Sequence, residues 1–346
     1  MNLRAATLVA ATLLFAACGG KDQSADTSEP SVADAGAELR ALFDEHFERT
    51  LEMNPTQATS IGDYRYNDRL ANRGSAEYRA AAEAMDSEFL GRLLEIDRGA
   101  LDDQDQLSYD IFRVSREQSL KGYQFPAYLQ PENQFRSAMS SFVRLGSGAG
   151  THPFNTVKDY EDFLKRADQA AVNVDTNIAN MREGARQGIV QPRILMEKLE
   201  PQLESQIVDD VKESAFYKPV ANMPEAFSDE DRARLTEAYE DQIANVIIPA
   251  YARLNNFLGD TYNAAARETV GLYALPNGPA WYEYMVRLRT TTDLTPDEIH
   301  QIGLDEVARI HGEMHKVMEE VGFEGDLKEF FEFVNTDPQF FFDEPE

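Results

Sequence analysis

The chain has 346 residues, of which 42% are hydrophobic and 27% are charged, and its 61 acidic residues against 33 basic ones give a net charge of −28. This composition excludes collagen-like chains, disulfide-framework domains and polytopic membrane proteins. Affinity for nucleic acid comes mainly from Lys and Arg on phosphates, so we expect such an acidic chain without a basic stripe to bind no nucleic acid.

Residues 1–17 are predicted to form a signal peptide. Arg4 precedes an apolar stretch, Ala5–Ala17, that only Thr7 and Thr12 interrupt. A membrane-spanning helix needs about 20 apolar residues, and this stretch is too short. A basic start followed by a short apolar stretch and small residues is typical of an export signal.

The predicted signal peptide is followed directly by Cys18, the only cysteine of the chain. The preceding residues, LFAA, resemble the end of the bacterial lipoprotein box, so Cys18 is predicted to become the lipidated N-terminus. The other interpretations of a lone cysteine are a free thiol, an intermolecular disulfide or a buried small hydrophobe, and the position of Cys18 favours lipidation. Because Gly19 rather than Asp follows, we expect a lipid anchor in the outer membrane, with the protein facing the periplasm.

Residues 18–36 are predicted to be the lipidated cysteine and a flexible tether. The sequence GGKDQSADTSEPSVADAG has a single Val as its only large apolar residue. Such a composition buries too little apolar surface to offset the entropy of ordering the chain. A flexible tether of this length would span about 20–25 Å.

Residues 37–346 are predicted to form one helical domain, an all-α, large irregular bundle of long helices. Nearly every segment has helical periodicity, and no alternating run is bounded by hairpin turn residues. The predicted helices are Ala37–Met53, Ser75–Arg98, Asp103–Gly122, Thr156–Gln187, Pro192–Val208, Ser228–Leu258, Pro279–Arg289, Thr295–Val321 and Asp326–Asn335.

Two of these helices carry specific structural signals. Pro249 lies inside Ser228–Leu258, so a kink or break is expected there. Thr295 followed by Pro296 and Glu298 is a complete start signal with a capping hydroxyl. The helix after Thr295 has one apolar stripe, which we expect to face other helices. The stripe contains Ile299, Gly303, Val307, Ile310, Met314, Val317 and Val321.

Three long stretches outside the predicted helices, Gln124–Gln134, Leu145–Pro153 and Gly271–Pro279, are rich in Gly, Pro or aromatic residues. Loops of this kind often line functional sites. The segment from Gly271 to Tyr284 combines Gly and Pro with four aromatic rings. These rings could pack in the core or line a cleft, and both interpretations stay open.

The histidines do not form a recognised metal motif. No His-Glu dipeptide occurs, so the H-E-x-x-H motif of zinc peptidases is absent from this sequence. His311 and His315 are one helical turn apart and His300 lies near the same face, but Glu313 points away from them. Two ligands leave zinc short of a third, so we interpret these histidines as half-exposed packing residues and expect no metal site.

The long run GLYALPNGPAWYEYMVRLRTTTDLTPDEIHQIGLDEVARI, residues 271–310, resembles the bacterial exported family catalogued as domain of unknown function 885 (DUF885). Further matching pieces are NPTQATSIGDYRYNDRL at 54–70, GIVQPRILMEKL at 188–199 and TDPQFFF at 336–342. The resemblance implies a helical fold related to zinc oligopeptidases and Taq-type carboxypeptidases that acts on peptides. It places an H-E-x-x-H motif downstream of the T-D-P segment, so we expect this chain to be the N-terminal portion of the family domain, truncated before the zinc-binding helix by nature or as a fragment. No catalytic residue is expected in it, and zinc only where the C-terminal part is present.

Two hypotheses about function follow. In the first, the chain is the N-terminal part of an exported, membrane-anchored zinc-dependent peptidase and supplies scaffold and substrate-cleft walls, with Tyr273, Tyr282, Tyr284 and Arg287 as candidates. In the second, it is a non-catalytic helical lipoprotein that binds peptides or partner proteins. The sequence leaves the peptide substrate and the oligomeric state open.

We predict that Cys18→Ser abolishes lipid attachment, because the only thiol that could receive the lipid is lost. Metabolic labelling with a radioactive fatty acid and fractionation of membranes measure the effect. The variant is expected to incorporate no label and to leave the membrane fraction, and continued labelling would contradict the assignment.

Overall fold

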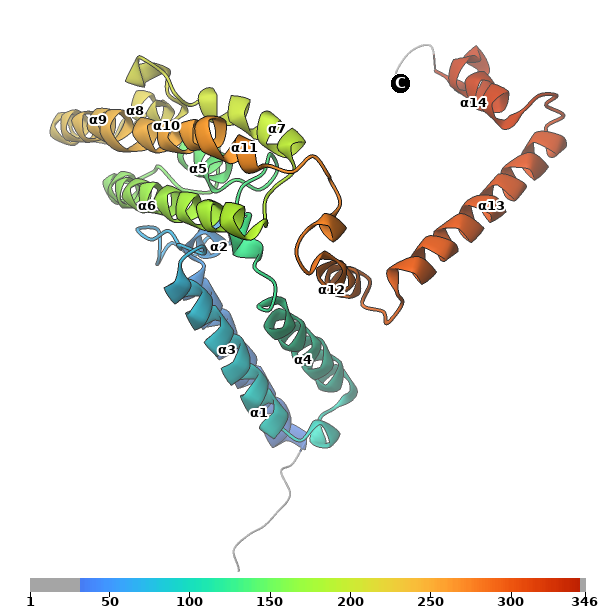
Figure 1. Ribbon diagram of the computed structural model, residues 1–346. Helices are drawn as coiled ribbons and strands as arrows, with labels where there is room; N and C mark the ends of the chain where they lie inside the picture. Colours follow the sequence, from blue (N-terminus) through green and yellow to red (C-terminus); the bar gives the residue numbers. More distant parts are fainter. Residues whose placement is uncertain (1–31, 343–346) are drawn as a thin grey trace, which may run out of the picture.

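The computed structural model describes residues 32–342, which form helices and loops (Figure 1). Within these residues the structure contains no β-strand, and a single isolated bridge joins Pro192 to Arg267. The all-α prediction is therefore confirmed. The predicted signal peptide and Cys18 lie outside the described residues. None of the helices between residues 32 and 342 combines the length and apolarity needed to cross a bilayer.

Three long helices form the N-terminal unit: α1 (Val32–Met53), α3 (Ala76–Glu95) and α4 (Asp103–Gly122) (Figure 1). The bounds of α4 agree with the prediction. Helix α1 begins at Val32, inside the segment predicted to be a flexible tether, and burial of Ala35 gives its first turns a packing partner. The core of the unit consists of Ala35, Leu39, Leu42, Met85, Phe89, Leu93, Ile96, Leu101 and Tyr109.

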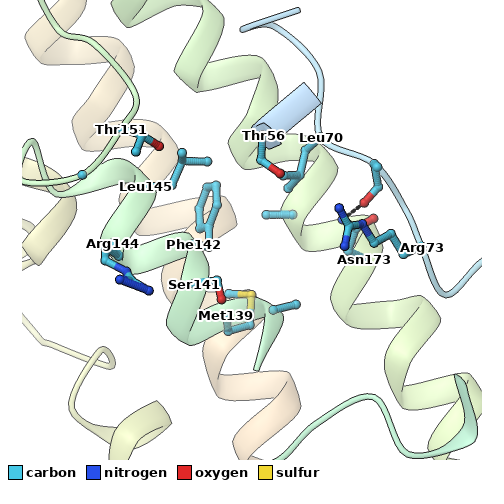
Figure 2. Close-up of a pocket in the computed structure, with 14 residues that line it drawn as sticks. Thr56, Leu70, Arg73, Met139, Ser141, Phe142, Arg144, Leu145, Thr151 and Asn173 are labelled. Carbon is cyan, nitrogen blue, oxygen red and sulfur yellow. Dashed lines mark hydrogen bonds between the residues drawn. The ribbon is translucent and has the colours of Figure 1, made fainter. Parts of the chain in front are cut away.

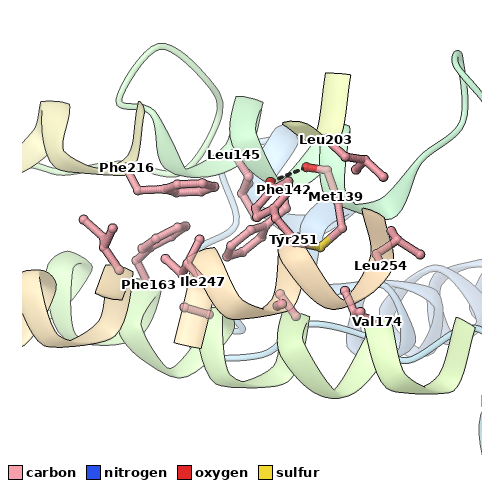
Figure 3. Close-up of a cluster of buried hydrophobic side chains, with 14 of the residues drawn as sticks. Met139, Phe142, Leu145, Phe163, Val174, Leu203, Phe216, Ile247, Tyr251 and Leu254 are labelled. Carbon is pink, nitrogen blue, oxygen red and sulfur yellow. Dashed lines mark hydrogen bonds between the residues drawn. The ribbon is translucent and has the colours of Figure 1, made fainter. Parts of the chain in front are cut away.

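The largest core lies between α5 (Ala138–Gly146), α6 (Val157–Gln187), α7 (Arg193–Glu204), α9 (Asp229–Gln242) and α10 (Ile248–Phe257). Figure 3 shows aromatic rings from several of these segments meeting in its centre. Buried tyrosine hydroxyls need hydrogen-bond partners, and here they donate to main-chain oxygens. The Phe142 ring packs on Phe163 and on Phe216, with centroids 5.3 Å apart in each pair. The Tyr251 hydroxyl donates to the Met139 oxygen at 2.8 Å.

The predicted long helix around Pro249 departs from regular α-helical geometry where expected. A π-helical turn, Ile243–Ile247, separates α9 from α10 and ends just before Pro249. Proline has no amide hydrogen for the helical ladder, and a π turn changes the bonding pattern ahead of it. A second π turn, Leu258–Tyr262, follows α10 and leads into α11 (Asn263–Ala265).

A smaller core holds α12 (Gly278–Thr290) against the loop after α4. Its buried members are Leu129, Ile189, Leu275, Trp281 and Tyr284. The chain enters α12 through Asn277 in the left-handed conformation, with φ of 56°. This core covers part of the aromatic segment that the sequence analysis singled out.

The remaining helices are α2 (Pro55–Ser60), α8 (Lys218–Ala221), α13 (Pro296–Glu320) and α14 (Leu327–Thr336). Helices α2 and α8 are short connections within the body. Figure 1 shows α13 running away from the other helices and ending beside α14. The start signal at Thr295 is confirmed, because its hydroxyl accepts the Glu298 amide at 3.2 Å and the Glu298 carboxylate accepts the Thr295 amide at 2.8 Å.

The expectation that the apolar stripe of α13 faces other helices is wrong for the described residues. Val307, Ile310 and Val317 are 51%, 40% and 46% exposed, and Met318 is the buried residue of this helix. Amphipathic spacing shows that a helix has an apolar face, but the spacing contains no information about which surface covers that face.

Arg166 of α6 joins α2 and the segment that follows it to the main bundle. Its side chain is fully buried, and it donates to the main-chain oxygen of Arg69 at 2.9 Å, to the Thr59 hydroxyl at 2.7 Å and to His152 Nδ1 at 2.9 Å. Burial lowers the pKa of Arg166 to about 10, so the guanidinium stays charged at neutral pH. It has neutral oxygen and nitrogen acceptors in place of a carboxylate.

His152 is held neutral in this cluster. Burial lowers its pKa to about 4, with the charge of Arg166 acting in the same direction. Its Nε2 lies 2.9 Å from the main-chain oxygen of Asp159 and is assigned as the protonated nitrogen, which leaves Nδ1 to accept from Arg166. The neutral ring therefore completes the bonding of the buried guanidinium.

We predict that Arg166→Met lowers the free energy of unfolding by about 3 kcal/mol or more, because several buried acceptors would lose their donor. Urea unfolding followed by circular dichroism measures the loss. The control is Arg186→Met in the last turn of the same helix, where the side chain is exposed and pairs only with Glu183. Equal stability of the two variants would contradict a structural role for Arg166.

Candidate functional site

A groove opens between α5, α6 and the extended segment 70–74. It consists of two adjoining hollows of about 520 and 430 Å³ that share Ala71, Arg73, Ala138, Ser141 and Asn173. Each volume falls in the range of about 300–1,000 Å³ that is usual for ligand sites. We call the two hollows together the α5–α6 groove.

The larger hollow has an apolar centre with polar groups on two sides. Figure 2 shows Phe142 in the middle, Arg144 on one side, and Arg73 with Asn173 on the other. Phe142 and Met139 also belong to the main core, so the floor of the groove is part of the rigid interior. This arrangement suits a ligand with an apolar group between polar ones.

A row of polar side chains on α6 holds the segment that carries Arg73. These residues are spaced three or four apart, which places them on one face of the helix. They bond to the backbone or side chains of residues 68–74, so the segment follows α6 closely. The bonds are Gln169 Nε2 to the Asp68 oxygen at 2.8 Å, the Leu70 amide to Gln169 Oε1 at 2.7 Å, Asn173 Nδ2 to the Ala71 oxygen at 3.1 Å, Asn72 Nδ2 to Thr176 Oγ1 at 2.8 Å, and Asn180 Nδ2 to the Gly74 oxygen at 3.0 Å.

Glycines allow the close approach of both walls to α6. A Cβ at Gly74 would lie 3.0 Å from Asn177 Oδ1, and a Cβ at Gly146 would overlap the Phe163 ring. Ser137 caps the start of helix α5, and its hydroxyl accepts the Met139 amide at 3.2 Å. The Ser137 cap and the close contact between Gly146 and Phe163 fix the position of α5, on which Ser141 and Arg144 line the groove.

The lining of the α5–α6 groove contains three arginines and no carboxylate. Arg73 and Arg144 line the larger hollow, and Arg73 and Arg136 line the smaller one, whereas neither lining includes Asp or Glu. None of the three arginines forms an ion pair within residues 35–342. The groove is therefore positively charged in a chain whose net charge is −28.

Glu132 lies buried close to the smaller hollow and does not line it. Its Oε1 accepts from Asn177 Nδ2 at 2.7 Å, and Asn177 lines the hollow. Burial raises the pKa of Glu132 to about 7, so this carboxyl is partly protonated at neutral pH. It therefore compensates the groove arginines less than an exposed glutamate would.

Two of the four substrate-cleft candidates lie at a separate, smaller hollow of about 290 Å³ beside α12. Tyr284 and Arg287 line it. The Tyr284 hydroxyl donates to the Gln118 oxygen at 3.0 Å, and Arg287 pairs with Asp293 at 2.5 Å, so both side chains already have protein partners.

The other two candidates, Tyr273 and Tyr282, lie outside this hollow. Their rings pack against each other with centroids 5.2 Å apart, and they are 52% and 39% exposed. The four residues thus divide between a small hollow and an open surface. Their role as substrate-cleft walls stays a prediction.

The residues described here do not fit a zinc ion. Among residues 32–342 no three His, Cys, Asp or Glu side chains gather as metal ligands. His300, His311 and His315 are exposed along α13, and Glu313 pairs with Lys316 at 3.0 Å.

The three groove arginines escaped the sequence analysis. A signal for one wall was present, because Gln169, Asn173, Thr176 and Asn180 form a polar row at helical spacing on α6. Such a row indicates a face that bonds to something, and it does not identify the segment 68–74 as the partner. Arg73 of this segment lines the same groove as Arg136 and Arg144 because of contacts between distant parts of the chain.

Comparison with known proteins shows one family and one fold. The sequence profile described as "Bacterial protein of unknown function (DUF885)" matches residues 55–346. The crystal structure of a "putative lipoprotein from Colwellia psychrerythraea" is similar, with a TM-score of 0.73 and 19% sequence identity, over 90% of this chain and 56% of that chain. The chain thus spans little more than half the length of this structural relative. No curated protein matches the chain significantly.

Proposed function

The chain belongs to the DUF885 family, and on that premise we propose that it is the peptide-holding portion of an exported, membrane-anchored zinc-dependent peptidase. The observation that carries the proposal is the α5–α6 groove, with its apolar floor and polar sides. The family resemblance supplies the link to peptide hydrolysis, and the groove supplies a place where a peptide can lie.

The chemistry of the groove suits an extended peptide. Phe142 and Leu145 offer an apolar surface for one side chain. Within residues 35–342 the Ser141 hydroxyl forms no hydrogen bond and the Asn173 side-chain oxygen accepts none, so both are available to peptide amides. A peptide held in this way would be oriented by its backbone and selected by its side chains.

The proposed anchor is the lipid on Cys18, in the outer membrane and facing the periplasm. The signal-like sequence before Cys18 supports export, and the similar Colwellia protein is described as a "putative lipoprotein". In this proposal residues 32–342 hold and orient a peptide, and they offer no group of three metal ligands for a zinc ion.

A photoreactive peptide tests the peptide-holding function. A peptide with benzoylphenylalanine between two leucines is expected to label fragments of the polypeptide Cys18–Glu346 that contain α5 or residues 70–74. Ser141→Trp places a bulky ring in the groove and should abolish the labelling. Its control, Ser115→Trp on an exposed face of α4, should not. Equal labelling of both variants would contradict the proposal.

We further expect the polypeptide Cys18–Glu346 to bind no stoichiometric zinc and to hydrolyse no peptide by itself. A catalytic zinc needs about three protein ligands and a nearby base, which His311, His315 and the outward Glu313 do not supply. Metal analysis and a peptide hydrolysis assay measure this. Stoichiometric zinc with chelator-sensitive turnover that is lost in His311→Ala/His315→Ala would contradict it.

The same assays separate the proposal from the alternative of a non-catalytic, peptide-binding lipoprotein. Under the first, hydrolysis appears when the rest of the family domain is supplied, either in the same chain or as a second polypeptide. Under the alternative, the groove binds peptides and no addition restores hydrolysis.

A further inference from the structure

Arginines of this protein are generally neutralised by neighbouring groups. Most of those in residues 35–342 lie within 4 Å of a carboxylate, as Arg65 does with Asp63 and Arg98 with Asp110. Others, such as Arg166 and Arg232, donate to main-chain oxygens inside the fold. A guanidinium without such partners is therefore an exception in this chain.

These exceptions concentrate at the α5–α6 groove. Arg136 and Arg144 have no bonded partner among the described residues, and Arg73 bonds only to the Asn54 side-chain oxygen at 2.7 Å. Two comparable arginines lie outside the groove among the described residues. Arg289 is at the exposed end of α12, and Arg182 of α6 lies over the Phe257 ring in a hollow that Asp175 and Asp260 also line. In so acidic a chain, a lining of this size without a carboxylate leaves the charge of three guanidinium groups uncompensated.

Uncompensated guanidinium groups at a hollow favour anionic ligands. Arginine binds a carboxylate through paired, charge-assisted hydrogen bonds, which are about twice as strong as neutral ones. The negative charge of the whole protein repels acidic peptides elsewhere on the surface. An acidic ligand that does bind is therefore directed to this groove.

The arrangement also specifies where the charges of the ligand lie. Arg144 and Arg73 stand on opposite sides of the apolar centre formed by Phe142 (Figure 2), and Arg136 lines the adjoining hollow beside the exposed ring of Phe135. A ligand that satisfies Arg144, Phe142 and Arg73 has an apolar side chain with a carboxylate on each side. The apolar floor favours a peptide over a polyphosphate, which has no group to place there.

We propose that the α5–α6 groove selects acidic peptides in which carboxylate side chains flank an apolar one. This deepens the proposed peptide-holding function and rests on it. Arg73 and Arg144 bind the two flanking carboxylates, and Phe142 contacts the apolar side chain between them.

Fluorescence anisotropy with two dye-labelled peptides tests the selectivity. One peptide contains Asp-Leu-Glu, and the matched peptide contains Asn-Leu-Gln, which has the same shape without the charges. The polypeptide Cys18–Glu346 is expected to bind the acidic peptide about tenfold more tightly, because each carboxylate gains a charge-assisted bond. Higher salt should weaken the binding of the acidic peptide and leave the affinity for the amide peptide nearly unchanged.

Single variants then locate the charges. Arg73→Gln and Arg144→Gln should each lower the affinity for the acidic peptide about tenfold and leave the affinity for the amide peptide unchanged. The control Arg289→Gln should change neither affinity. All three side chains are exposed, and thermal unfolding checks that the variants stay folded.

Each contrary outcome overturns a different statement. Equal affinity for the two peptides would overturn the acidic selectivity and leave the peptide-holding function standing. Failure of both peptides to bind would overturn both. If Arg289→Gln lowers the affinity equally, the effect is due to overall charge. If inorganic phosphate at constant ionic strength displaces the labelled acidic peptide as effectively as the unlabelled peptide does, the groove is a phosphate site.

Discussion

The buried guanidinium of Arg166 is the interaction on which the rest of the structure depends. It connects α6, in the centre of the main bundle, to Thr59 in α2 and to the main chain at Arg69. A buried charge is costly unless all its donors are bonded, and here the acceptors are main-chain oxygens, a hydroxyl and the neutral ring of His152. The fold of residues 55–69 is therefore coupled to the position of one side chain.

The polar row on α6 continues this coupling from Arg166 towards the groove. Gln169 and Asn173 bond to the backbone that follows Arg69, so the segment has little freedom to leave the helix. Arg73 then lies at the groove because of contacts several residues before it. Hydrogen bonds between uncharged groups thus fix the position of Arg73, which contributes to the positive charge of the groove.

Local signals in the sequence predicted much of the fold. The capping residues at Thr295 and the proline at position 249 act over a few residues, and both predictions were confirmed in position. Helix α5 was not predicted because it has only 9 residues and lies in a Ser- and Gly-containing stretch that also suits a loop. Phe142 of this helix packs on Phe163, and a helix this short depends on such tertiary packing more than on helix propensity.

The candidate site was less predictable because its residues come from three separate parts of the chain. Tyr284 and Arg287 are neighbours on one helix, and aromatic density alone directed attention to them. Arg73, Arg136 and Arg144 are unremarkable in sequence, since most arginines here are paired with acids. Only the three-dimensional arrangement shows that these three lack carboxylate partners and line the same groove.

Hydrogen exchange of residues 66–74 tests most directly whether α6 builds the groove wall. In the wild-type protein the Leu70 amide, which donates to Gln169, is expected to exchange slowly. Gln169→Ala should speed exchange in this segment and leave α10 protected, while the control Gln187→Ala at the exposed end of α6 should change neither. Rapid exchange of the segment in the wild type, or no change in Gln169→Ala, would contradict the account.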